Sequence, residues 1–297
     1  MAEERSVAEK IVTTFLLIII TLIGTFGNFL ISYIFNRKGM VKHVHISTRY
    51  LIISLGIVDM IISISNVVYL FNLHGYDLTG NYILCQTSGF VNIGLVLSSI
   101  WIIVLIGLNR ACIVTRKPYY FTKNRTLFYI FLAWLLPMLV GIAPIFGWSK
   151  YFNRKSQLVC TIVFLNSKSF SVFYLIAFEL VPGITLGVCT FIILKIKKKN
   201  LKRIVTFEIS NKEERLKQDS RQTVMLLVVI LAFVICFLPE CLLKRVRRHY
   251  VPHTAIDALS SIFRLTNHAV NPLIYGLLNT DFRRSLFRII LKIVRCK

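Results

Sequence analysis

Charged residues are scarce in this sequence. Asp, Glu, Lys and Arg make up only 16% of the 297 residues, whereas 56% are hydrophobic and the mean hydropathy is +0.68. Roughly a quarter of the residues in an ordinary soluble domain are charged. The shortage therefore argues against a water-exposed globular protein and in favour of a membrane protein.

The low charge also leaves long apolar stretches uninterrupted. Three stretches contain no charged residue, and they cover residues 11–36, 78–109 and 126–149. Four others contain one charge each: 50–76 (Asp59), 169–194 (Glu179), 222–243 (Glu240) and 258–280 (Arg264). All seven are long enough for the ~20 residues with which a helix crosses hydrocarbon. The sequence thus predicts an all-α membrane protein built as a seven-transmembrane helix bundle.

Patterns typical of other protein classes are missing. The six histidines are scattered and no His-Glu-x-x-His pattern occurs, so we do not expect an enzyme. A transporter would be expected to carry an internal repeat with matched broken helices, and the sequence has none. The first apolar stretch is longer than the core of a signal peptide and has no small-residue cleavage site. We therefore expect it to remain as the first helix.

Basic residues are unevenly distributed between alternate loops. With the N-terminus outside, the inner loops and tail hold 25 of the 36 Lys and Arg residues, and the outer segments hold 10. Short basic loops stay in the cytoplasm, so this orientation is the favoured one. We expect a plasma-membrane protein with a short extracellular N-terminus (1–10), a transmembrane domain (11–280) and an amphipathic eighth helix with a short tail (281–297). The basic surplus then faces membrane lipid and cytoplasmic partners, and we expect no nucleic-acid partner.

Three of the seven cysteines lie outside the predicted helix interior. Cys85 and Cys160 both fall on the outer side of this topology, where an oxidising environment lets a disulfide persist. We expect this bridge to tie the start of the third helix to the second outer loop. Cys296 lies near the inner end of a basic amphipathic segment, where it is either a lipid-attachment site or an ordinary free thiol.

The last apolar stretch ends with Asn271-Pro272-x-x-Tyr275, followed by Phe282-Arg283. Other stretches carry further motifs in order: Gly27-Asn28, Leu55-x-x-x-Asp59, Asn109-Arg110-Ala111, Trp134, Pro182 and Phe233-x-x-Cys236-Phe237-Leu238-Pro239. Over residues 11–290 this set resembles the rhodopsin-like (class A) G-protein-coupled receptors. Within that family, the stretch at 144–151 is similar to its opsin and melatonin-receptor members.

The resemblance implies a receptor that senses an extracellular small molecule or short peptide and activates a heterotrimeric G protein. Because proline removes a backbone donor and bends helices, we expect kinks at Pro182, Pro239 and Pro272. Kinked helices can act as the moving levers of a switch. The family assigns the switch and the G-protein contact to these positions: Asn109, Arg110, Asp219, Phe237, Pro239, Asn271, Pro272 and Tyr275.

Polar side chains inside hydrocarbon have to satisfy one another. We therefore expect an interior network formed by Asn28, Asp59, Ser99, Asn267 and Asn271. In the family the last four of these positions line a sodium pocket, so the resemblance implies a sodium ion at Asp59. His268 replaces the small serine that is usual there, and an ion-free hydrogen-bond network is the alternative.

Arg110 lies at the inner foot of the third helix, where the family pairs an arginine with an acidic neighbour in the resting state. That neighbour is Asn109 here. We expect Asp219, at the foot of the sixth helix, to be the remaining acidic partner. A single exposed ion pair contributes only ~0–1 kcal/mol, so the predicted lock is weak.

We expect a ligand pocket between the outer halves of the helices, with Asn92, Glu179, Phe237, Arg264 and Leu265 as its residues. In the family, amine receptors carry an aspartate where Asn92 stands. Opsins attach retinal to a lysine where Leu265 stands, so an opsin-like photoreceptor is disfavoured.

An anionic ligand is the third possibility for this pocket. Arg264 lies inside a predicted membrane span, and an outer basic run consists of Lys244, Arg245, Arg247 and Arg248. Guanidinium groups attract carboxylates and phosphates by steering and by paired hydrogen bonds. The alternatives are that the run is a solvated loop and that Arg264 pairs internally with Glu179.

Overall fold

The computed structural model describes residues 6–37, 40–41, 44–154, 159–206, 223–225, 227–239 and 254–295. The principal elements follow in this order: α1 (Val7–Asn36), α2 (Ile46–Ser65), α3 (Val67–Leu73), α4 (Tyr82–Val114), α5 (Lys123–Ile142), β1 (Tyr151–Arg154), β2 (Val159–Ile162), α6 (Lys168–Tyr174), α7 (Val181–Thr206), the helical segment Thr223–Pro239, α9 (Thr254–Leu278) and α10 (Thr280–Arg295). Short 3-10 turns lie at Leu78–Gly80, Pro118–Phe121 and Phe164–Asn166.

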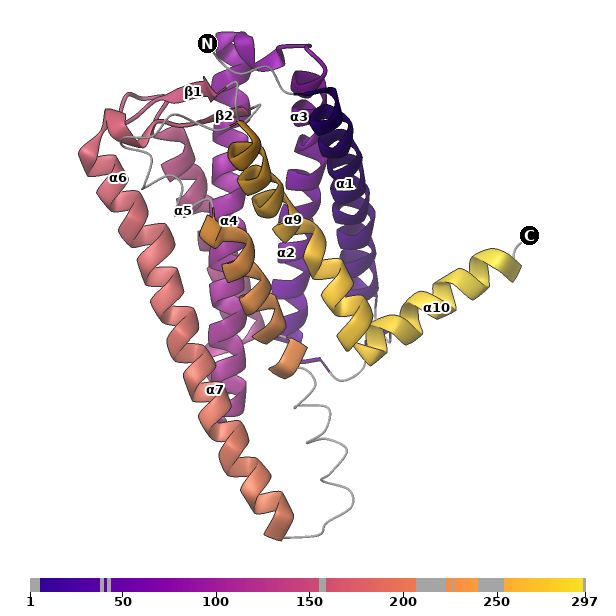
Figure 1. Cartoon of the computed structure of the whole chain (residues 1–297). Coiled ribbons are helices and arrows are strands. Elements are labelled where there is room, and N and C mark those ends of the chain that lie inside the picture. Colours follow the sequence, from indigo (N-terminus) through magenta and orange to yellow (C-terminus); the bar gives the residue numbers. More distant parts are fainter. Residues whose placement is uncertain are drawn as a thin grey trace.

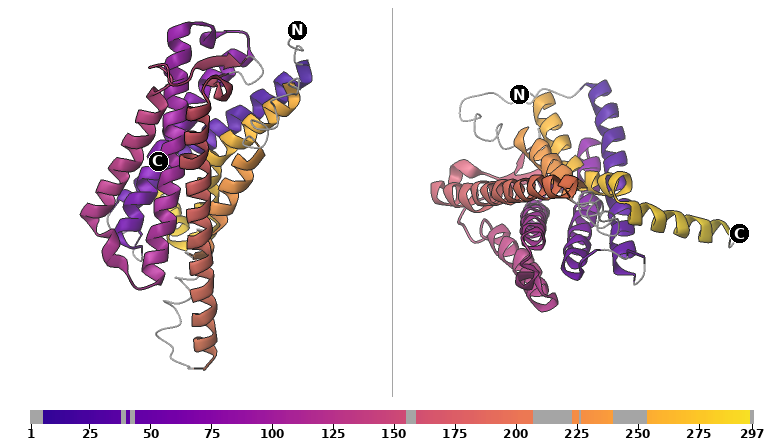
Figure 2. Two further views of the ribbon diagram at one scale, coloured as in Figure 1. Left: turned by 90° about the vertical axis from the view of Figure 1, so that its left-hand side faces the viewer. Right: turned by 90° about the horizontal axis from the view of Figure 1, so that it is seen from below.

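The long helices stand side by side as a bundle, and α10 leaves its lower end at a steep angle (Figure 1). Seen from below, α10 projects away from the other helices (Figure 2). Within the described residues, five helical spans are long and apolar enough to cross a membrane: Val7–Asn36, Ile46–Leu73, Tyr82–Val114, Lys123–Ile142 and Lys168–Lys198. They correspond to the first five predicted spans. The shorter apolar helix Thr223–Pro239 and α9 lie where the sixth and seventh were expected.

The bundle carries apolar side chains on its outside and polar ones at its centre. Phe15 of α1 and Phe191 of α7 are each 64% exposed, whereas Asp59 and His268 are fully buried. Large exposed apolar surfaces mark contact with another apolar phase. This inverted arrangement is the one expected of helices surrounded by lipid, whose polar groups have to face the bundle interior.

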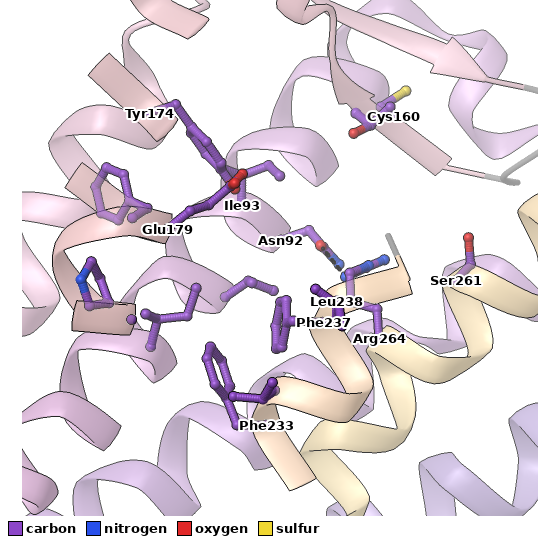
Figure 3. A pocket seen from close by; sticks show the side chains of 17 residues that line it. Asn92, Ile93, Cys160, Tyr174, Glu179, Phe233, Phe237, Leu238, Ser261 and Arg264 are labelled. Atoms are coloured by element: carbon purple, nitrogen blue, oxygen red, sulfur yellow. Dashed lines mark hydrogen bonds between the residues drawn. The ribbon is translucent and has the colours of Figure 1, made fainter. Parts of the chain in front are cut away.

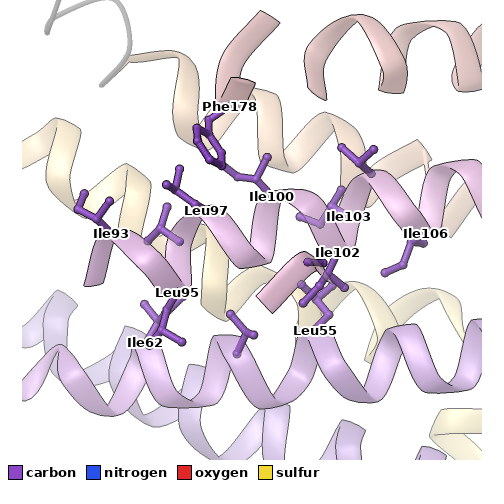
Figure 4. Close-up of a cluster of buried hydrophobic side chains, with 14 of the residues drawn as sticks. Leu55, Ile62, Ile93, Leu95, Leu97, Ile100, Ile102, Ile103, Ile106 and Phe178 are labelled. Atoms are coloured by element: carbon purple, nitrogen blue, oxygen red, sulfur yellow. The ribbon is translucent and has the colours of Figure 1, made fainter. Parts of the chain in front are cut away.

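The main hydrophobic core is built around α4. Within the most apolar part of each helix, 72% of the residues of α4 are buried, against 28% for α1. Leu97, Ile102 and Ile103 of α4 pack with Leu55 and Ile62 of α2 in one cluster (Figure 4). A helix that is hydrophobic all round belongs inside a bundle, and α4 is the central helix here.

Small residues let α1 approach its neighbours closely. A Cβ atom added to Gly27 would lie 2.5 Å from Cβ of Pro272 on α9, so a larger residue would push the two helices apart. On α2, a Cβ atom on Gly56 would lie 2.6 Å from Oγ of Ser32 on α1. Close backbone approach at small residues is the usual way in which membrane helices pack. It gives the Gly27-Asn28 motif a structural reason.

Two of the prolines singled out from the sequence lie in irregular or interior helical positions. Pro182 is the second residue of α7, directly after a π-helical turn at Leu175–Leu180. Pro272 lies inside α9, and Pro239 is the last described residue of its helical segment. Wide turns and prolines are the usual causes of helix bends. The kinks at these prolines stay a prediction.

A short antiparallel hairpin covers the end of the bundle near the N-terminus (Figure 1). β1 pairs with β2 so that Tyr151 lies opposite Ile162. A disulfide joins Cys160 of β2 to Cys85 near the start of α4, with a Cα–Cα distance of 5.3 Å. The predicted bridge is therefore confirmed. The hairpin itself was not anticipated from the sequence, and it adds one small sheet to an otherwise helical protein.

Candidate functional site

A cluster of polar side chains lies at the centre of the bundle, around Asp59 of α2. Its Oδ1 atom accepts a hydrogen bond from Oγ of Ser99 at 3.0 Å and lies 2.7 Å from Nδ1 of His268. Its Oδ2 atom accepts a hydrogen bond from Nδ2 of Asn271 at 2.7 Å. Three of the five residues predicted for the interior network therefore meet directly, and His268 joins them.

The other two predicted network residues are placed differently. Asn28 donates from Nδ2 to the backbone oxygen of His268 at 2.8 Å and to that of Gly24 at 2.8 Å, so α1 is tied to the backbone of α9. Asn267 is buried, but its Nδ2 atom has no hydrogen-bond partner among the described residues. Asn28 thus extends the cluster, whereas no described hydrogen bond links the Asn267 amide nitrogen to it.

The residues around Asp59 do not fit the sodium ion that the resemblance implies. A hard cation is bound by oxygen ligands. Here both carboxylate oxygens already accept hydrogen bonds, and Nδ1 of His268 lies against Oδ1.

The C-terminal end of α4, far from the disulfide, carries the predicted switch residues Asn109 and Arg110. Nη2 of Arg110 donates to Oγ1 of Thr223 at 3.0 Å, and Arg110 is only 4% exposed. Asn109 turns toward α2, where its Oδ1 accepts from Oγ of Ser47 at 2.9 Å and its Nδ2 donates to Oγ1 of Thr48 at 2.7 Å. Asn109 is therefore a link between α4 and α2.

Thr223 is a partner of Arg110 that sequence reasoning missed. The predicted partner, Asp219, lies outside the described residues. Positions four residues apart share a face wherever the chain is helical, and the sequence predicts a helix here. The four-residue spacing was the signal from which Thr223 could have been found, because Arg110 can donate to any hydrogen-bond acceptor on that face.

Tyr275, at the end of the Asn-Pro-x-x-Tyr motif, lies in an aromatic joint between α1, α9 and α10. Its ring centroid is 5.7 Å from that of Phe35, and Phe35 is 6.5 Å from Phe282. Tyr275 and Phe282 are each 3% exposed. Such a packed joint fixes where α10 leaves the bundle, and it makes the position of α10 depend on the end of α9.

A cavity of about 310 Å³ opens between α4, the π-helical turn with α7, the segment Thr223–Pro239 and α9. Four of the five predicted ligand residues line it: Asn92, Glu179, Phe237 and Arg264 (Figure 3). Further lining is aromatic, from Tyr174, Phe178 and Phe233. Cavities lined by apolar side chains with a few polar groups are the usual form of small-molecule sites.

Arg264 is held at the wall of this cavity by two polar neighbours. Its Nη1 donates to Oδ1 of Asn92 at 3.2 Å, and its Nη2 donates to the hydroxyl of Tyr69. The residue is 7% exposed. These bonds join α9 to α4 and to α3, so the guanidinium has a defined orientation at the cavity. Tyr69 was not anticipated, because nothing in its sequence neighbourhood identifies a cross-helix partner.

Leu265, the fifth residue expected at the pocket, lies elsewhere. It is 0% exposed and belongs to an apolar cluster with Leu17 of α1 and Tyr69 and Leu73 of α3. Consecutive helix residues point about 100° apart because a turn has 3.6 residues. Arg264 therefore reaches the cavity while Leu265 faces α1 and α3.

The remaining predicted site residues lie outside the described part of the chain. They are Cys296 and the basic run Lys244, Arg245, Arg247 and Arg248. The helix that precedes Cys296 is described: α10 leaves Phe287 and Val294 more than 60% exposed among basic residues. This agrees with a helix that lies on a membrane surface.

Comparison with known families resolves the identity of the fold. The family described as "7 transmembrane receptor (rhodopsin family)" matches residues 27–275, and so most of the chain. This chain belongs to the rhodopsin family of receptors. Membership confirms the resemblance and the fold class predicted from the charge-free stretches. It also identifies a multi-pass membrane receptor.

Relatives within the rhodopsin family are distant. The chain is 25% identical over 292 residues to "Rhodopsin, GQ-coupled" of Mizuhopecten yessoensis and 26% identical over 302 residues to "Melatonin receptor type 1A" of Mus musculus. These alignments cover 91% and 95% of this chain, and 57% and 81% of the relatives. The chain also spans 53% of "Melanopsin-B" of Xenopus laevis. It is thus little more than half the length of some of its relatives.

The fold of squid rhodopsin is similar to that of this chain. The two superpose with a TM-score of 0.84, at 18% sequence identity, over 99% of this chain and 89% of the squid protein. The bundle and α10 therefore share the fold of that protein.

Proposed function

We propose that this receptor senses an extracellular small molecule or short peptide and activates a heterotrimeric G protein. The observation that carries the proposal is the placement of two polar sites at opposite ends of one bundle. The cavity with Arg264 lies near the disulfide, and Arg110 with Thr223 lies at the far end of α4. A ligand can shift such a bundle only if it binds one arrangement better than another.

The ligand class that best suits the cavity is a small anion with an apolar body. The aromatic walls provide contact for an apolar group, and Arg264 is held at the wall by Asn92 and Tyr69. A guanidinium with fixed orientation suits a carboxylate or phosphate, because both accept two parallel hydrogen bonds. Glu179 lines the same cavity, so a ligand with an additional cationic group is also accommodated.

The disulfide supports the proposed orientation in the plasma membrane. The disulfide joins β2 to the start of α4, and β2 lies at the end of the bundle where α1 begins (Figure 1). Disulfides persist on the extracellular side and are rare in the cytosol. The N-terminus is therefore proposed to be extracellular and α10 to lie on the cytoplasmic side.

A photoreceptor is the second proposal, favoured by the rhodopsins among the relatives. The position that would need a lysine for retinal holds Leu265, which lies in an apolar cluster with α1 and α3. A leucine has no amine and forms no Schiff base. Light sensing by that chemistry is therefore the weaker proposal.

Guanine-nucleotide exchange by the purified receptor in lipid nanodiscs tests both proposals. Heterotrimeric G proteins are offered in the dark, under illumination, and with a panel of carboxylates, phosphates and their neutral esters. The main proposal expects exchange to rise with an acidic compound and not with its ester. Exchange that responds to light alone would favour the photoreceptor, and no response to any panel member would contradict the anionic ligand.

Variants of Arg264 test whether ligand-stimulated nucleotide exchange depends on the cavity. Arg264→Leu should abolish the dose response while surface expression persists, and Arg264→Lys should retain part of it because the charge remains. Thr266→Val is the matched control, since the described hydrogen bond of the Thr266 hydroxyl runs to the backbone oxygen of Ile262 on its own helix. A full response in Arg264→Leu would remove this residue from the ligand site.

A further inference from the structure

Three helices meet at the buried carboxylate of Asp59, and α1 is tied to one of them. Ser99 reaches it from α4, and His268 and Asn271 reach it from α9. Asn28 of α1 holds the backbone oxygen of His268 at 2.8 Å. The side chains of Asp59 and His268 are both 0% exposed, so no part of this contact lies at the surface. His268 is thus fixed by its backbone as well as by its ring.

The direction of this hydrogen bond depends on the charge of the carboxylate. When Asp59 is ionised it only accepts hydrogen bonds, and Nδ1 of His268 is then the donor to Oδ1. This donation is available to the neutral ring with its proton on Nδ1 and to the charged ring alike. Together with the hydroxyl of Ser99 and the amide of Asn271, the imidazole directs three donors at one carboxylate.

We propose that the His268 side chain replaces the sodium ion in this receptor. The ring fills the space beside Asp59 and directs a donor, rather than an oxygen ligand, at the carboxylate. Donors repel a cation, and hard cations select oxygen ligands. The receptor therefore keeps Asp59 satisfied with its own side chains, and its stability does not respond specifically to sodium.

The replacement also changes how α2 and α9 are connected. A sodium ion exchanges with solvent, whereas His268 is part of α9 and cannot leave. His268 lies four residues before Pro272, about one helical turn away. The link between α2 and the Asn-Pro-x-x-Tyr end of α9 is therefore built into the chain and does not depend on the salt outside.

Thermal unfolding of the full chain in detergent tests the replacement without ligand or G protein. The free cysteines Cys189 and Cys236 are buried, so a thiol-reactive dye reports their exposure as the protein unfolds. Unfolding is compared in sodium chloride and in potassium chloride, both at ~150 mM so that ionic screening is equal. The wild type should unfold at the same temperature in both salts.

His268→Ser restores the small hydroxyl that is usual in relatives and should create the missing sodium site. Its unfolding temperature should rise by a few degrees in sodium relative to potassium, because an ion that binds only the folded state stabilises it. Asp59→Asn in the His268→Ser background should remove that rise. His74→Ser, at an exposed histidine at the end of α3, is the matched control and should show no sodium effect.

Two outcomes would overturn the replacement. One is a sodium-specific rise in the wild type that Asp59→Asn abolishes, since the ion would then bind beside His268. The other is a folded His268→Ser protein without any sodium effect, because His268 would then not be what excludes the ion. His268→Asn serves as a second variant if the serine variant does not fold. A failed G-protein assay affects neither outcome, so this inference is judged separately from the proposed function.

Discussion

The two ends of the bundle are held together by different kinds of bond. At the end near the N-terminus, the disulfide between Cys85 and Cys160 joins α4 covalently to the hairpin, and the hydroxyl of Tyr151 donates to the backbone oxygen of Gly141 at 2.5 Å. At the far end of α4, the described contacts of Arg110 and Asn109 are hydrogen bonds to hydroxyl groups.

This difference indicates which end is suited to move. A hydrogen bond contributes ~0.5–1.5 kcal/mol net, or ~1.5–3 kcal/mol with a charged partner, so it opens reversibly. A disulfide does not open without a reductant. The disulfide end is therefore suited to hold a cavity in shape, and the Arg110 end is suited to change its contacts. Between them, the Asp59–His268 contact joins α2 to α9.

Among the variants that test this difference between the two ends, the loss of the disulfide should have the largest effect. In Cys85→Ser the bridge between residues 75 positions apart is lost, and native disulfides typically contribute ~2–5 kcal/mol. The hairpin would no longer be anchored to α4. We expect a large fall in surface expression and in the unfolding temperature followed by circular dichroism.

Cys112→Ser is the control for that experiment. Cys112 is a free, half-buried cysteine on the same helix, so its replacement removes a thiol without breaking a bridge. It should leave expression nearly unchanged. Equal stability of Cys85→Ser and Cys112→Ser would mean that the disulfide end does not depend on its covalent bond.

Weakening the other end should raise activity in the absence of ligand. Thr223→Val removes the hydroxyl that accepts from Arg110 at 3.0 Å and keeps the shape of the side chain. A hydrogen bond to a charged group contributes ~1.5–3 kcal/mol, so the population of the resting arrangement relative to the active one should fall by at least about tenfold. Ligand-free nucleotide exchange by the purified receptor should rise accordingly.

Thr25→Val provides a matched comparison on α1. The hydroxyl of Thr25 is buried and has no hydrogen-bond partner among the described residues, so its removal breaks no described bond. Ligand-free exchange should stay at the wild-type level. If Thr223→Val also stays there, the Arg110–Thr223 bond does not hold the resting state.

Much of the bundle could be predicted because hydrocarbon imposes simple rules. Spans have to be long and nearly free of charge, and polar groups inside have to meet one another. These rules led to the spans and to the meeting of Asp59, Ser99 and Asn271. The disulfide followed from topology, since Cys85 and Cys160 fell on the same oxidising side.

Contacts that depend on the rotation of one helix against another could not be predicted. Leu265 and Arg264 are adjacent in sequence, yet one faces α1 and α3 and the other lines the cavity. Tyr69 became the partner of Arg264 for the same reason. The hairpin was missed because its strands have only four residues each, too few for a clear alternating pattern.

A smaller effect is expected from the hydrogen bond that Tyr151 of the hairpin makes with the end of α5. Burial raises the pKa of the Tyr151 phenol, so the hydroxyl stays protonated and donates to Gly141 at physiological pH. Tyr151→Phe should lower the free energy of unfolding by ~1 kcal/mol. Tyr82→Phe, at a tyrosine that is 74% exposed, should not change it. A similar change in both variants would assign the effect to the lost hydroxyl alone and not to this bond.

The smallest predicted effect concerns the neutral residue beside Arg110. Asn109→Asp introduces the acid that the family resemblance implies at this position, while the hydroxyls of Ser47 and Thr48 can both donate to the new carboxylate. The added charge next to Arg110 should stabilise the resting state by ~0–1 kcal/mol, the range of a single ion pair. Ligand-free nucleotide exchange should fall by a few-fold at most. Asn36→Asp places the same charge on an exposed residue at the end of α1 and should leave exchange unaltered. An unchanged rate in Asn109→Asp would mean that Asn109 acts only as the link between α4 and α2.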